Sequence, residues 1–132
     1  MDLSPLFSAP PAVQGHAYAA LIALILGGVM LICTKGTPSH KALGRAWVAI
    51  MVAVAGSSFW ITGLMPGGGF GPIHILSIVT LVALPYAIWQ VRRGNVRAHR
   101  VTMISVFVGG PVIAGLLTLL PGRLMSITVF GP

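Results

Sequence analysis

Four apolar stretches, each about 20 residues long, constrain what this chain can fold into. They cover residues 14–33, 43–64, 73–91 and 101–120. A helix needs roughly 20 apolar residues to cross about 30 Å of hydrocarbon, whereas strands of a membrane β-barrel are nearer 10 residues and alternate in polarity. These stretches have the full helical length and do not alternate. We therefore predict an all-α membrane protein: one domain over residues 1–132, with four transmembrane helices in an up-down bundle.

The composition favours the same class of protein. Hydrophobic residues make up 56% of the chain and charged residues 7%, whereas soluble domains carry about 25% charged residues. Asp2 is the only acidic residue, so hydrolases that need a carboxylate pair or a Ser-His-Asp triad are excluded. Transport coupled to protons through an intramembrane carboxylate is disfavoured for the same reason.

The basic residues predict the orientation in the membrane. Seven of the eight lie in the first and third connections, namely Lys35, Lys41, Arg45, Arg92, Arg93, Arg97 and Arg100. Positive loops stay in the cytoplasm, so we expect both termini on the periplasmic side of a bacterial inner membrane. The net charge of +7 then serves topology and contacts with anionic lipids at the cytoplasmic loops. We expect no nucleic acid partner.

The chain looks like one two-helix hairpin used twice, with halves of about 14–66 and 72–122. His16 and His74 each stand 20 residues before a glycine, and His40 and His99 each precede a basic residue. Two hairpins in the same orientation imply an approximate two-fold axis along the membrane normal. The axis would place His16 opposite His74 near the outer face, and His40 opposite His99 near the inner face.

These four histidines are the candidate cofactor-binding and metal-binding residues. Ionisable groups inside membrane helices are costly and mark functional sites, and histidine is a common axial ligand of haem iron. Each pair could hold one haem b in the bundle, which gives one or two haems per chain. Histidines near an interface also hydrogen-bond water, headgroups or loop carbonyls without any ligand, and this second interpretation stays open.

Two arginines and the tryptophans have predicted roles nearer the membrane surfaces. Arg123 could pair with a haem propionate, a quinone oxygen or an anionic substrate, or anchor in the headgroups. Arg45 could serve an inner propionate, although lipid phosphate is the simpler partner. Trp47, Trp60 and Trp89 are predicted to lie in interfacial belts, and the glycines within the apolar stretches are predicted to allow close helix approach.

Several segments carry a resemblance to a known family. They are KGTPSHKALGRAW (35–47), GFGPIHILSI (69–78), RRGNVRAHR (92–100) and LPGR (120–123), together with His16 near the start of the first helix. With them the chain resembles, over nearly its whole length, small bacterial predicted membrane proteins of an unknown-function family, DUF2306. That resemblance implies a four-helix membrane fold and no established activity.

The histidine pattern is also similar, more loosely, to that of b-type transmembrane cytochromes with two haems. Those proteins pair histidines between alternate helices, which implies His16 with His74 and His40 with His99. The chain departs from them in having no further helices. About 18 residues, or roughly 27 Å of helix, also separate its two histidine levels, which disfavours fast electron transfer between two haems.

The sequence therefore supports two functional hypotheses. The first is a haem-binding membrane protein that takes part in electron transfer as an oxidoreductase or carrier. The second is a non-catalytic accessory subunit of a larger respiratory or photosynthetic membrane complex, or a homo-oligomer, with no chemistry of its own.

Overall fold

The computed structural model describes residues 1–62 and 67–132, and every regular element in these residues is helical. The long helices are α2 (Pro11–Ile32), α3 (Pro38–Ser57), α4 (Pro72–Arg92) and α5 (Val96–Phe107). A short 3₁₀ turn, η1 (Ser58–Trp60), extends α3. A π-helical segment, η2 (Val108–Ala114), and α6 (Gly115–Leu117) extend α5. Two short helices, α1 (Ser4–Phe7) and α7 (Leu124–Phe130), lie near the chain ends.

The prediction of four spanning helices is confirmed. Four helical runs are long and apolar enough to cross a membrane: Pro11–Ile32, Pro38–Trp60, Pro72–Arg92 and Val96–Leu117. All four start one to five residues earlier than predicted. In the first three spans, Pro11, Pro38 and Pro72 serve as first helical residues, where a missing N–H costs nothing. The predicted end of the second span at residue 64, and Pro66 of the proposed repeat, lie outside the described residues.

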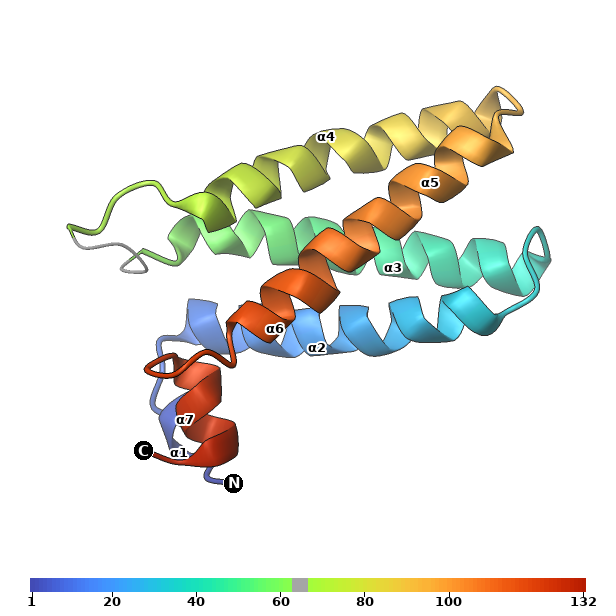
Figure 1. The fold of residues 1–132 in the computed structure, drawn as a ribbon. Helices are drawn as coiled ribbons and strands as arrows, with labels where there is room; N and C mark the ends of the chain where they lie inside the picture. The colour runs from blue at the N-terminus through green and yellow to red at the C-terminus, as the bar shows by residue number, and fades with distance from the viewer. Residues whose placement is uncertain (63–66) are drawn as a thin grey trace.

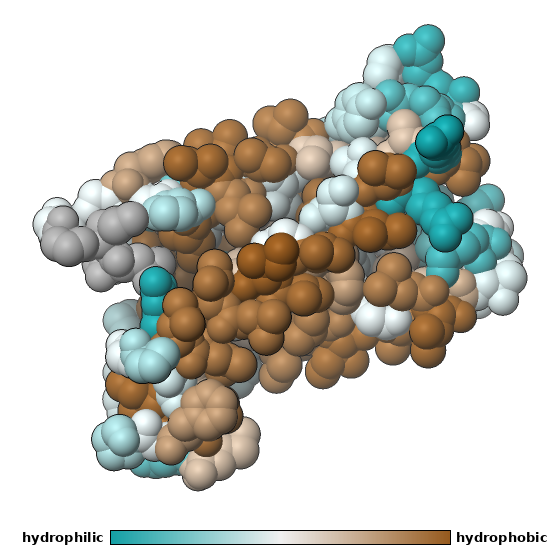
Figure 2. Space-filling view, in the orientation of Figure 1, coloured by the Kyte–Doolittle hydropathy of each residue, from teal (hydrophilic) through white to brown (hydrophobic). Residues whose placement is uncertain are grey.

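The four spans form two hairpins that close into a bundle. α2 packs on α3, α3 on α4, and α4 on α5, while η2 returns to contact both α2 and α4. Figure 1 shows α5 crossing the hairpin of α2 and α3 obliquely, with the connections at residues 33–37 and 93–95 at one end and both termini at the other. We call these the basic end and the terminal end. Hydrophilic residues gather at the basic end, and hydrophobic residues cover the middle (Figure 2).

Pro111 lies inside the π-helical segment rather than at a simple kink. A proline in a helix removes one hydrogen-bond donor and crowds the preceding turn. A π turn is wider than an α turn and is one way for a helix to continue past such a site. The last span thereby runs on as far as Leu117.

Trp47 lies in the bundle core. The prediction that it lies in an interfacial belt is therefore wrong. Trp47 is 2% exposed and packs with Met51, Leu84 and Phe107. Its Nε1–H donates a 2.9 Å hydrogen bond to the carbonyl oxygen of Ala23 on α2. The indole lies against the small residues Ala23 and Gly27 of α2, and its donor is satisfied within the bundle.

Gly27 is the position that lets these rings approach α2. A Cβ placed on Gly27 would lie 2.5 Å from two ring carbons of Phe107 and 2.9 Å from Nε1 of Trp47. Both rings are buried, so neither can swing away into solvent. Gly28, the next residue, has open space at the same position. The prediction of close helix approach at a glycine is therefore met at Gly27 and not at its neighbour.

The terminal end carries a small helical pair that the sequence analysis did not predict. α1 and α7 pack together, and Asp2 N–H donates to the carbonyl oxygen of Thr128 at 2.9 Å. The Asp2 carboxylate accepts from Ser4 N–H at 2.9 Å, and this bond holds the pKa of Asp2 below its ordinary value. The two chain ends are thus tied to each other.

We predict that Gly27→Ala lowers the free energy of unfolding by about 1–3 kcal/mol, because the added methyl group overpacks buried aromatic rings. The matched variant Gly28→Ala should stay within about 0.5 kcal/mol of the parent chain, since nothing lies near its Cβ. Unfolding by sodium dodecyl sulfate in mixed micelles, followed by helical circular dichroism, measures both. Equal effects of the two variants would contradict this packing.

Candidate functional site

The four histidines lie at two levels of the bundle, as predicted. His16 on α2 and His74 on α4 lie towards the terminal end, and His40 on α3 and His99 on α5 lie towards the basic end. Three of them fall in first helical turns. His16 lies one turn further in, because α2 already begins at Pro11.

His16 is hydrogen-bonded across the first hairpin to the end of α3. Its Nδ1 lies 3.0 Å from Ser57 Oγ, and that hydroxyl donates to the carbonyl oxygen of Val54 at 3.0 Å. A hydroxyl has one proton to donate. Ser57 must therefore accept from His16, so the proton of the neutral ring is on Nδ1 and the lone pair is on Nε2.

His74 has the opposite tautomer and closes the first turn of α4. Gly71 N–H donates to His74 Nδ1 at 3.0 Å, so the ring proton is on Nε2. The ring stacks on Phe70 at 4.8 Å between centroids, contacts Phe59 at 5.8 Å, and is 5% exposed. His74 is the third residue of α4, and it accepts from the backbone N–H of Gly71, which precedes the helix. This is a capping arrangement. Sequence reasoning missed it, although the order Gly71-Pro72-Ile73-His74 places an acceptor at this position.

A pair of serines links α3 and α4 beside these histidines. Ser58 Oγ lies 2.7 Å from the carbonyl oxygen of Ala55, and Ser77 Oγ lies 2.8 Å from that of Ile73. Each hydroxyl has one proton, so one of the two serines donates to the other and accepts no second proton from it. Their Oγ atoms also hydrogen-bond to each other, and both residues are buried. This contact between helices was not predicted. The terminal-end histidines and this serine pair form a polar layer in which His16 Nδ1, His74 Nδ1 and both serine hydroxyls each have a hydrogen-bond partner.

That layer does not fit a haem held by both outer histidines. Axial ligation needs a lone pair on the ligating nitrogen and normally leaves the other ring nitrogen as a donor. His16 meets this requirement through Nε2. His74 does not, because its lone pair already accepts the Gly71 N–H.

The basic-end pair has a different donor set. His99 Nδ1 lies 3.0 Å from the carbonyl oxygen of Ala87 on α4. A carbonyl can only accept, so Nδ1 carries the proton and Nε2 has the free lone pair. This is the orientation in which a second-shell carbonyl holds a metal-ligating histidine.

His40 contains an unpaired nitrogen. Its Nδ1 is, within residues 1–62 and 67–132, the one buried side-chain nitrogen or oxygen that has no hydrogen-bond partner. The backbone N–H of the same residue donates to Thr37 Oγ1 at 3.2 Å, which caps α3. Buried polar atoms are nearly always paired, so this nitrogen needs an explanation.

The basic residues around this pair have separate contacts. Lys35 Nζ donates to the carbonyl oxygens of Met30, Leu31 and Cys33 at 2.7–2.9 Å. It thus caps the C-terminus of α2, where a positive charge is favoured. Arg45 is exposed on α3, and Arg123 is exposed at the start of α7, at the opposite end from His40 and His99.

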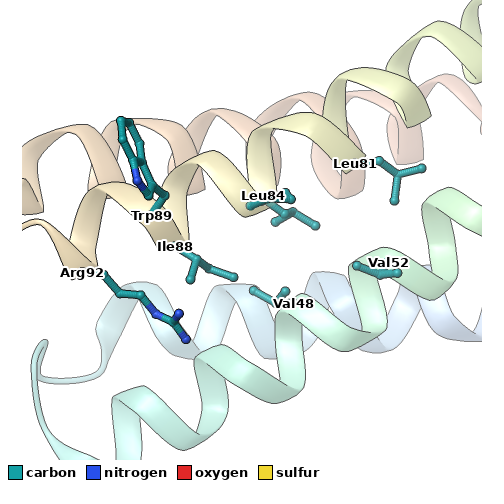
Figure 3. Close-up of a pocket in the computed structure, with 8 residues that line it drawn as sticks. Val48, Val52, Leu81, Leu84, Ile88, Trp89 and Arg92 are labelled. Atoms are coloured by element: carbon teal, nitrogen blue, oxygen red, sulfur yellow. The ribbon is translucent and has the colours of Figure 1, made fainter.

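Two hollows on the described surface of the bundle are lined without any histidine. The larger, of about 310 Å³, lies between α3 and α4 (Figure 3). The smaller, of about 220 Å³, lies between α4 and α5. In the part of the chain that the structure describes, no three His, Cys, Asp or Glu side chains gather at one point.

The hydrogen bonds predict distinct ring tautomers. In ¹⁵N NMR spectra of the protein in micelles or bilayers, neutral His74 should carry its proton on Nε2, and neutral His16 and His99 on Nδ1. Ser57→Ala should change the ring-nitrogen shifts of His16 and leave those of His99 unchanged. A common tautomer for His16 and His74 would contradict the assigned network.

Comparison with known proteins gives one match. The family model described as "Predicted membrane protein (DUF2306)" matches residues 13–129, nearly the whole chain. No curated protein and no solved structure matches the chain. The resemblance noted from the sequence segments is therefore confirmed.

Proposed function

The chain belongs to the DUF2306 family of predicted membrane proteins, and on that premise we propose that it binds one b-type haem through His40 and His99. The chain is an integral membrane protein with four candidate spans. The proposed role is electron transfer at a bacterial inner membrane. When bound, a b-type haem supplies one-electron redox chemistry.

The observation that carries the proposal is the buried, unpartnered Nδ1 of His40 at the same end of the bundle as His99, whose ring is already oriented as a ligand. His99 is held by the Ala87 carbonyl, which fixes its tautomer and directs Nε2 away from α4. His40 is held by the capped first turn of α3. The two residues stand on alternate spans of the bundle, because α4 packs against both α3 and α5.

Arg45 has a supporting place in this proposal. It follows His40 on α3, is exposed, and carries a fixed positive charge near the basic end. A guanidinium group binds carboxylates well, so Arg45 could hold a propionate. Arg123 belongs to the terminal end and takes no part in a basic-end site.

The proposed orientation places the basic end in the cytoplasm and both termini in the periplasm, following the positive-inside rule. Cys33, the only cysteine, lies at the basic end and is partly exposed. A membrane-impermeant maleimide should label it in inverted membrane vesicles and not from the periplasmic side of spheroplasts. The control variant Cys33→Ser with Ser8→Cys, whose thiol lies at the terminal end, should behave in the opposite way. Labelling of Cys33 from the periplasmic side would contradict the orientation.

An optical spectrum tests haem binding. The protein purified after expression with haem supply should show a Soret band that is lost in His40→Ala and in His99→Ala. The control His16→Gln should keep the band, because it changes a histidine of the polar layer at the other end. A parent chain without a Soret band, or equal losses in all three variants, would overturn the proposal.

The accessory-subunit hypothesis is the second candidate, and one observation favours it. Only 11% of the most apolar window of the first span and of the last span is buried within the chain. These faces are covered by lipid, by another subunit or by a second copy of the chain. A colourless protein that stays in a stable larger assembly in mild detergent would favour this candidate over haem binding.

A further inference from the structure

We propose that the hollow between α3 and α4, called here the α3–α4 groove, binds one acyl chain of an anionic phospholipid, with the lipid phosphate at Arg92. The groove is lined by Val48 and Val52 of α3 and by Leu81, Leu84, Pro85, Ile88, Trp89 and Arg92 of α4. Arg92 is its one charged lining residue. The inference uses no histidine and is independent of haem binding.

The shape of the groove fits a single chain running along the bundle. Its α4 residues follow the spacing of one helical face, so they form a continuous stripe. From Leu81 to Arg92 the stripe rises roughly 16 Å at 1.5 Å per residue. That length is about half of a 30 Å hydrocarbon core, which is the depth of one leaflet. Its α3 side is lined by two valines, Val48 and Val52.

The charge lies where a lipid phosphate would lie. Arg92 is the last residue of α4, and its side chain extends towards α3 beside Ile88 and Val48 (Figure 3). The next residue, Arg93, instead has its guanidinium 4.6 Å from the centroid of the Trp89 ring. The two adjacent arginines therefore make different contacts, and only Arg92 lines the groove. An apolar slot that is one leaflet deep, with a cation at its surface end, complements an anionic lipid.

Native mass spectrometry tests the charged end of the groove. The protein is extracted in mild detergent from vesicles of equal phosphatidylglycerol and phosphatidylcholine, and the retained lipids are counted. The parent chain should retain phosphatidylglycerol over phosphatidylcholine, and Arg92→Gln should reduce this preference about fivefold. Arg97→Gln, an equal charge change at an exposed site outside the groove, should leave it unchanged. No preference in the parent chain, or equal effects of the two variants, would overturn the proposal.

A second pair of variants tests the apolar part. Val48→Phe should fill the groove and reduce retention of lipid of either kind while keeping every charge. Val82→Phe is the matched control, because Val82 is 66% exposed on α4 and lies outside the groove. Unchanged retention in Val48→Phe, with helical circular dichroism equal to that of the parent chain, would show that the lipid lies elsewhere and would overturn the proposal.

Discussion

The contact of Trp47 and Phe107 with the bare backbone of Gly27 is the interaction on which the rest of the bundle depends. In lipid, apolar side chains gain little by meeting one another, so helices associate through close packing and satisfied polar groups. Gly27 supplies the close packing, and the hydrogen bond from Trp47 to the Ala23 carbonyl satisfies the only polar atom of the indole. Through these residues α2, α3 and the end of α5 meet in one place.

The two histidine levels differ in chemistry although the sequence suggests a repeat. At the terminal end, His16 Nδ1 donates to the Ser57 hydroxyl, whereas His74 Nδ1 accepts from the Gly71 N–H. At the basic end, His99 Nδ1 bonds to the carbonyl oxygen of Ala87, and the buried Nδ1 of His40 has no hydrogen-bond partner. A repeat in the sequence does not impose equal hydrogen bonds, because these depend on individual neighbours. The proposal of a single basic-end haem rests on this asymmetry.

The sequence was sufficient to predict the features that depend on hydropathy and helix-start chemistry. The four spans follow from their length and apolar character, and the cap at Thr37 follows from the Thr-Pro pair before His40. The inward position of Trp47 could not be predicted, because it depends on which face of α2 meets α3 across the hairpin. The pairing of α1 with α7 also depends on contacts between the two chain ends. The tautomers of His16 and His74 required atomic positions, since a few tenths of an ångström decide which neighbour bonds to a ring.

The haem content per chain, measured as the pyridine haemochrome of purified protein with a known protein concentration, tests the central claim most directly. If His40 and His99 ligate haem and His74 keeps its bond to Gly71, as proposed, each chain holds one haem. A value of two would mean that His74 gives up its bond to Gly71 and that the two levels are equivalent. A value of zero after expression with haem supply would mean that the unpaired nitrogen of His40 has another purpose.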